Sequence, residues 1–179
     1  MLVKTYGSAV NGIHAATITI EVDVTAGIKF FLVGLPDNAV KESEQRIRAS
    51  LQNNGYRIPG KKIIINMAPA DIRKEGSAYD LPLAIGILAA SGQMKSNKIS
   101  DYIIMGELYL DGGLQHIKGA LPIAVKAREE GFKGIILPKE NAREAAIVSD
   151  LEVLGVDNIK QLIDFFNGDI EVEKTELDT

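Results

Sequence analysis

KIIINMAPADIRKEGSAYDLPLAIGILAAS, residues 62–91, is the stretch that decides the fold of this sequence. Residues 62–68 are mostly apolar and predict a buried strand. Residues 81–91 are apolar on nearly all sides, which predicts a helix that lies inside the core. Short acidic side chains favour helix N-caps, so Asp71 and Asp80 are expected to cap helices. The stretch therefore predicts a strand and a helix that share one core.

Three further strands, two of which form a hairpin, are predicted before this stretch. In residues 14–24, HAATITIEVDV, apolar and polar side chains alternate with the period of two that is typical of a half-buried strand. Residues 2–10 are expected to form another strand. Gly27 marks a turn, and residues 28–33 predict a strand that forms a hairpin with residues 14–24.

Helices and strands mix in the rest of the chain, which predicts an α+β fold in one domain. The acidic tail beyond Gly168 is expected to be frayed. Asp111 most simply caps the turn at residues 111–113, and an acid–base pair with Glu107 is the alternative. The remaining expected elements are a helix from residues 36–38 to Gly55 with Val40, Ile47 and Leu51 inward, strands at 102–110, 134–137 and 151–154, and helices at 119–130 and 158–166.

The composition excludes several classes of site. The 179 residues include no cysteine, which excludes disulfides, cysteine nucleophiles and thiolate metal sites. His14 and His116 lie far apart in the sequence, so no metal site is expected. The longest apolar run, residues 81–90, is too short to span a membrane. The first residues lack the apolar segment of a signal peptide, and a cytoplasmic location is therefore expected.

The charge of the chain is unevenly distributed. The formal net charge is −4, but residues 36–75 hold eight Lys/Arg against five Asp/Glu, and residues 139–179 hold four against eleven. This asymmetry indicates either an anion-binding face or an ordinary solvated surface.

Residues 55–62, GYRIPGKK, resemble a phosphate-binding loop but lack its essential features. Such a loop needs a hydroxyl side chain after the lysine, and Lys62 stands there instead. Pro59 removes one backbone donor. A helix is predicted before the segment and a strand after it, the reverse of the order that the motif requires. We therefore expect no nucleotide site here.

Three longer stretches carry a family resemblance. The first, residues 30–91, contains VGLP…VKE and APAD…KEG…DLP. The second, residues 106–129, contains GELYLDGGLQHIKGALP, and the third, residues 131–144, is GFKGIILPKENARE. They resemble the amino-terminal domain of the ComM/YifB family of Mg-chelatase-related AAA+ ATPases. The resemblance implies a ribosomal protein S5 domain 2-like fold, which is shared with the Lon proteolytic domain and the carboxy-terminal domain of RadA.

The resemblance also implies what lies outside the sequence. Residues 1–168 correspond to a single domain, followed by a tail (169–179) that is expected to be disordered. In the family an AAA+ module follows, and ATP and Mg²⁺ are implied only there; no cofactor is expected on this chain. The implied partners are that module, neighbouring subunits of a hexameric ring and DNA, on which ComM drives branch migration during natural transformation.

Lon-type peptidases use a serine and a lysine, and both positions are altered here. Matched to the Lon pattern, Ala78 falls in the nucleophile position and Ser77 one residue earlier. Leu121 falls in the lysine position, and Lys118 three residues earlier. The resemblance therefore implies a non-catalytic domain. The alternative is a peptidase in which Ser77 and Lys118 approach to about 3 Å, the reach of a hydrogen bond.

A basic ridge is predicted on the helix that begins at residues 36–38. Lys41, Gln45, Arg48 and Gln52 share one face of this helix, which we call the basic ridge. Cationic side chains of this kind neutralise phosphates, the main source of affinity for DNA. The alternative is a face that packs on a neighbouring subunit. The candidate DNA-binding residues are Lys41, Arg48, Arg57, Lys61, Lys62, Arg73 and Lys74.

Overall fold

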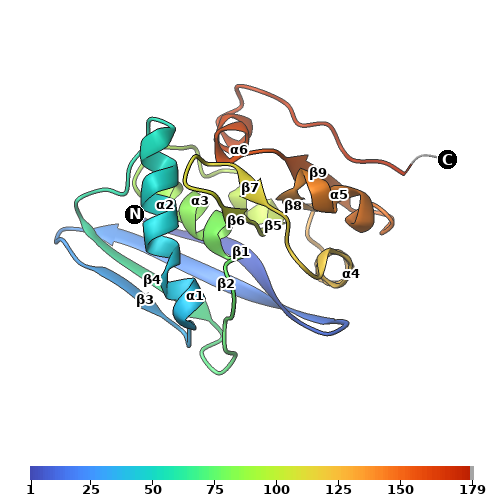
Figure 1. Cartoon of the computed structure of the whole chain (residues 1–179), viewed down its shortest axis with the longest axis horizontal. Coiled ribbons are helices and arrows are strands. Elements are labelled where there is room, and N and C mark those ends of the chain that lie inside the picture. Colours follow the sequence, from blue (N-terminus) through green and yellow to red (C-terminus); the bar gives the residue numbers. More distant parts are fainter. Residues whose placement is uncertain (178–179) are drawn as a thin grey trace.

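The computed structural model describes residues 1–177. Its helices pack against a seven-stranded mixed sheet (Figure 1). The predicted α+β fold is confirmed. In spatial order the strands are β3 (Phe30–Val33), β4 (Lys62–Ala68), β2 (His14–Thr25), β1 (Leu2–Asn11), β5 (Tyr102–Ile104), β8 (Gly134–Pro138) and β9 (Glu152–Val156). The helices are α1 (Asn38–Lys41), α2 (Ser43–Asn53), α3 (Asp80–Ala90), η1 (Ile99–Asp101), α4 (Ala120–Glu129), α5 (Lys139–Ala145) and α6 (Ile159–Phe166).

Strand direction divides the sheet into two parts. β1 pairs antiparallel with β2, and β2 pairs antiparallel with β4. From β1 outward, β5, β8 and β9 run parallel to one another, and β3 runs parallel to β4 at the other edge. A separate two-stranded sheet joins β6 (Glu107–Leu108) to β7 (Leu114–Gln115).

The predicted hairpin of residues 14–24 with residues 28–33 is wrong. Both strands form, but β4 lies between them, and β2 makes its hairpin with β1 instead. β2 pairs with β1 from His14 to Asp23 on one side and with β4 from Thr19 to Thr25 on the other. The four residues of β3 therefore find a free partner only at the outer edge of β4.

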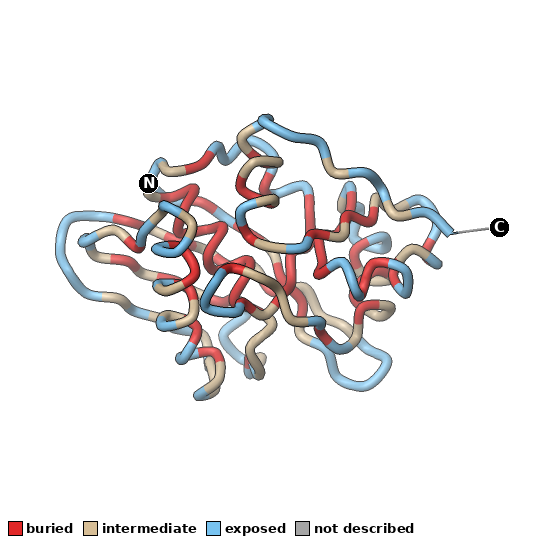
Figure 2. The backbone as a smooth tube through the Cα atoms, turned by 45° about the horizontal axis from the view of Figure 1, so that its top comes forward, coloured by how far each residue is buried: buried red, intermediate tan, exposed pale blue. Residues whose placement is uncertain are grey.

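Helix α3 is the centre of the core, as its sequence predicts. All eleven of its residues are buried, and it packs against β1 and β2. Gly86 allows this close approach, because a Cβ there would lie 2.6 Å from Val22 on β2. Figure 2 shows the buried backbone concentrated in the middle of the molecule and the exposed backbone in the loops.

Several predicted boundaries change in the structure. The helix expected from residue 36 to Gly55 is divided at Glu42 into α1 and α2, although Val40, Ile47 and Leu51 are buried as predicted. The strand expected at 102–110 is divided into β5 and β6, because Gly106 turns aside to pair with the loop before α3. The turn cap at Asp111 is confirmed, since its carboxylate accepts the Gly113 N–H at 2.8 Å.

The carboxyl-terminal tail lies along β9. The Thr175 N–H donates to the Val153 carbonyl at 2.8 Å, and Lys174 forms a bridge with Leu154. The frayed tail stays a prediction, and residues 178–179 of it lie outside the described residues. Among residues 1–177, no helix combines the length and the apolar character needed to cross a membrane.

Candidate functional site

Lys74, in the loop between β4 and α3, is buried rather than exposed. Its amine donates to the carbonyl of Gly34 at 2.6 Å and to the carbonyl of Pro69. Its backbone N–H and C=O also bond to Leu35 and Asp37. Burial lowers the pKa of the Lys74 amine, and the nearby charge of Asp71 opposes this. Lys74 cannot reach a phosphate from this position, so its place among the DNA-binding candidates is corrected.

Asp80 does not cap helix α3 but anchors helix α2 to it. The N-cap position belongs to Tyr79, and Asp80 lies fully buried in the first turn. Its carboxylate accepts the hydroxyl of Ser43 at 2.6 Å, the Arg46 Nε at 2.7 Å and the Leu108 N–H at 3.0 Å. The predicted cap at Asp71 is also wrong, because no helix begins there in the described chain.

Asp80 is a buried carboxylate that pairs with the partly buried guanidinium of Arg46. Burial raises the pKa of the Asp80 carboxyl, and the hydrogen bonds from Arg46, Ser43 and Leu108 oppose that rise. The hydrogen bond to Asp80 raises the pKa of Arg46 in turn. A carboxylate that accepts this many donors is held in one position. Asp80 therefore fixes α2, α3 and β6 relative to one another.

A cleft of about 490 Å³ lies at the amino-terminal end of α3. It gathers Ser77, Ala78 and Lys118, three of the four residues predicted for the altered dyad. Leu121 lies outside the cleft on α4 and packs against the core. The other residues that line the cleft are Ser8, Val10, Glu75, Gly76, Tyr79, Met105, Glu107, Gln115, His116 and Ile117.

Within the cleft, Ser77 is paired with a carboxylate. Its hydroxyl donates to Glu107, and in the described chain no hydrogen bond joins it to Lys118, which is exposed. The pairing of backbones explains this partner: Gly106 donates to Ala78 at 2.8 Å and accepts from Leu81 at 3.0 Å, which brings Glu107 beside Ser77. Sequence reasoning had compared Glu107 only with Asp111, because nothing in the spacing connects it to Ser77.

The basic ridge is exposed along helices α1 and α2. Its four residues, Lys41, Gln45, Arg48 and Gln52, all face solvent, as predicted. Arg57 follows in the next loop, and together with Arg48 and Gln52 it borders a shallow depression of about 400 Å³. The ridge is therefore a continuous polar surface that ends in a groove.

The other basic candidates are dispersed. Lys61 is exposed in the loop before β4. Lys62 lies on β4 with its amine 5.9 Å from the ring of Phe31 on the neighbouring strand. Arg73 is exposed and pairs with Glu75 at 3.2 Å. The structure thus brings Arg48 and Arg57 to one depression, with Lys41 exposed further along on α1, and gives Lys62 and Arg73 other partners.

Comparison with known proteins places the chain in a family. Residues 20–141 match the family described as subunit ChlI of Mg-chelatase. The chain belongs to this family. It is 42% identical to the uncharacterized protein YifB of Escherichia coli and 40% identical to the competence protein ComM of Haemophilus influenzae, in each case over 91% of this chain and 32% of the relative. It is also 28% identical to the DNA repair protein RadA of Listeria monocytogenes, over 67% of this chain and 24% of that protein.

This ChlI-family chain spans about a third of the length of the curated relatives that it matches. ChlI is described as a subunit of Mg-chelatase, so the loop before β4 and the His, Asp and Glu side chains bear on whether this chain could hold a nucleotide or a metal. Residues 54–61 connect α2 to β4, so the element order is helix, loop, strand as predicted, and Lys62 occupies the hydroxyl position. These residues do not fit a phosphate-binding loop. In the described residues no three His, Asp or Glu side chains are grouped as metal ligands would be.

Proposed function

We propose that this chain is the non-catalytic, Lon-protease-like amino-terminal domain of a Mg-chelatase-related AAA+ ATPase, and that it contacts DNA and neighbouring subunits for that motor. The fold that we assign to it is the ribosomal protein S5 domain 2-like fold. The observation that carries the DNA part is the exposed basic ridge, continued by Arg57. ATP and Mg²⁺ belong, in this proposal, to the motor module and not to this chain.

The charge distribution on α2 supports contact with a polyanion. Lys41 and Arg57 have no carboxylate within ion-pair distance in the described chain, and Arg48 has only Glu44, which is one turn away on the same helix. Exposed pairs of this kind are weak and are screened by salt, so Arg48 remains available to a phosphate. The neutral amides of Gln45 and Gln52 between these charges are further hydrogen-bond donors for a phosphate backbone.

The contents of the cleft support the absence of peptidase chemistry. A serine nucleophile needs a base that takes its proton, and a lysine serves only where its amine touches the serine. Ser77 instead donates to the carboxylate of Glu107. Ala78 and Leu121, in the two positions that the Lon resemblance assigns to the dyad, carry no reactive group.

The relatives support a larger machine. YifB and ComM are about three times as long as this chain, which leaves room for an ATPase module. ComM is named as a competence protein and RadA as a DNA repair protein, and the second name connects a related protein with DNA. By the same reasoning we propose ring assembly for the full-length protein, with this domain as one of its contact surfaces.

Fluorescence anisotropy with a labelled DNA duplex tests the DNA contact. We expect salt-sensitive binding by the chain at micromolar concentration, and clear weakening in the triple variant Lys41→Gln/Arg48→Gln/Arg57→Gln. The dependence of log K on log salt should flatten by about 0.9 for each phosphate contact that is lost. The matched control is Lys95→Gln/Lys98→Gln/Arg143→Gln, which removes the same number of charges from exposed positions elsewhere.

Equal loss of affinity in the two triple variants would show that only net charge matters and would remove the ridge as the contact. Absence of binding at low salt would refute DNA contact by this domain. In that case light scattering of the domain with and without its motor module decides whether the ridge is a subunit interface, because the ridge variant should then prevent assembly and the control should not.

A further inference from the structure

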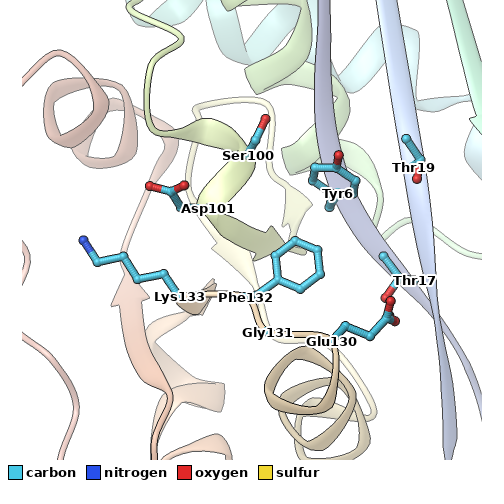
Figure 3. A pocket seen from close by; sticks show the side chains of 9 residues that line it. All are labelled: Tyr6, Thr17, Thr19, Ser100, Asp101, Glu130, Gly131, Phe132 and Lys133. Carbon is cyan, nitrogen blue, oxygen red and sulfur yellow. Dashed lines mark hydrogen bonds between the residues drawn. The ribbon is translucent and has the colours of Figure 1, made fainter.

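A second cavity, of about 600 Å³, shares no lining residue with the ridge or the cleft described above (Figure 3). It forms where β1 and β2 meet the turn between α4 and β8. Tyr6 and Thr19 are register partners on β1 and β2, on the face opposite to that which packs on α3. The turn contributes Glu130 and Phe132, and η1 contributes Asp101. Three parts of the chain that are distant in sequence thus build one site.

Two aromatic rings form the floor of this cavity. The rings of Tyr6 and Phe132 meet edge to face, with centroids 5.3 Å apart and an angle of 65° between their planes. The Phe132 N–H donates to the Ala127 carbonyl at 3.0 Å, which fixes the turn that carries its ring. An edge-to-face pair leaves part of one ring face free to receive a cation or a planar group.

Two carboxylates flank the aromatic floor without a cationic partner. Glu130 accepts the hydroxyl of Thr17, which holds its carboxylate at the rim. Asp101 lies on the other side of Phe132 (Figure 3). In the part of the chain that the structure describes, neither carboxylate forms an ion pair. Lys133, on the Asp101 side, is the one cation of the lining, so the cavity carries a net negative charge.

We propose that this cavity binds an arginine side chain of a partner protein. A guanidinium is planar and weakly hydrated, so it stacks on aromatic rings and donates to a carboxylate at the same time. Phe132 and Tyr6 supply the rings, Glu130 the carboxylate, and the Thr19 hydroxyl a further acceptor. The net charge of this cavity is opposite in sign to that of the basic ridge. The arginine site is therefore separate from the proposed DNA contact.

NMR titration of the isotope-labelled 179-residue chain tests this site. The probe is N-acetyl-arginine amide, and the comparison compound is its neutral isostere N-acetyl-citrulline amide. We expect the arginine probe to shift the amide signals of Thr17, Glu130 and Phe132 with a Kd on the order of a few millimolar, as befits one side chain. Citrulline should bind at least about fivefold more weakly, since it keeps the planar group and loses the charge.

Two variants separate the site from its surroundings. Glu130→Gln keeps an acceptor for Thr17 and should weaken the arginine probe at least about fivefold. Glu129→Gln removes an exposed carboxylate from the neighbouring position, outside the cavity, and should leave binding unchanged. Phe132→Leu should also weaken binding while the rest of the spectrum stays that of the folded chain.

Three results would overturn the proposal. The first is the absence of shifts at these residues, and the second is equal binding of citrulline. The third is stronger perturbation of the same residues by a neutral disaccharide such as maltose, which would assign the aromatic floor and the carboxylates to a sugar instead.

Discussion

Helix α2 carries two arginines two positions apart, and the structure gives them opposite surroundings. Arg46 faces inward and donates to the buried carboxylate of Asp80 at 2.7 and 3.0 Å. Arg48 faces outward and meets only Glu44 on its own helix, at 3.1 Å. Two positions on a helix turn a side chain through about 200°, so arginines two positions apart can serve the fold and a partner separately.

The loop before α3 repeats this contrast in neighbouring residues. Lys74 is buried and bonded to two carbonyls, whereas Arg73 beside it is exposed and pairs with Glu75 in solvent. Counting basic residues therefore overstates the surface that DNA can contact, because Arg46 and Lys74 are already occupied inside the protein. Substitution of an inward-facing residue is therefore expected to reduce the stability of the protein much more than substitution of an outward-facing one.

The largest effect is expected at the inward pair. Asp80→Asn should lower the free energy of unfolding by about 3 kcal/mol, because it leaves Arg46 without its charged partner in a buried site. The matched change at the outward pair, Glu44→Gln, should cost less than about 0.5 kcal/mol. Urea unfolding followed by circular dichroism measures both. Similar losses in the two variants would contradict the contrast between the faces of α2.

A smaller effect is expected at Lys74. Lys74→Met keeps the length of the side chain but leaves the carbonyls of Gly34 and Pro69 without their donor, at a cost of about 1–3 kcal/mol. Arg73→Met removes an exposed charge and should change stability by no more than about 0.5 kcal/mol. The same unfolding experiment measures both variants. If Arg73→Met proved the more damaging, the buried role of Lys74 would be untenable.

A third effect depends on pH. Burial raises the pKa of the Tyr79 phenol, with Asp37 adding to the rise. In the unfolded chain a phenol titrates near pH 10, so the native state keeps a proton there that the unfolded state releases. Stability is therefore full below about pH 10 and decreases above it, by at most about 1.4 kcal/mol per pH unit for one phenol. Unfolding at pH 9, 10 and 11 should show a shallower decrease in Tyr79→Phe; an unchanged slope would argue against this.

The sequence predicted the elements of this fold better than their partners. The pattern of residues 81–90 was enough to place α3 in the core, because a helix that is apolar on all sides has no face for solvent. The alternation of residues 14–24 predicted β2 and its buried face in the same way. It could not predict which strands lie beside β2, because alternation describes one strand and pairing depends on all of them.

The candidate site shows the same limit for charged residues. The spacing of Lys41, Gln45, Arg48 and Gln52 predicted an exposed face, and that face is exposed. The burial of Lys74 and Asp80 could not be predicted, because Gly34 and Arg46, which bond to them, lie 40 and 34 residues away in the sequence and come near only when the chain folds. Glu107 beside Ser77 was missed for the same reason, since 30 residues separate them.

The smallest effect is expected in the cleft, where Ser77 is half-buried and its hydroxyl is held by a carboxylate. A fluorophosphonate probe labels serines that a neighbouring base activates. Because the Ser77 hydroxyl donates to Glu107 and not to the amine of Lys118, labelling of the chain should not exceed that of Ser77→Ala. Ser100→Ala, which alters an exposed serine outside the cleft, serves as the control. Labelling that disappears in Ser77→Ala and slows in Lys118→Met, but persists in Ser100→Ala, would establish the peptidase alternative and would show that the cleft is rearranged when it binds a substrate.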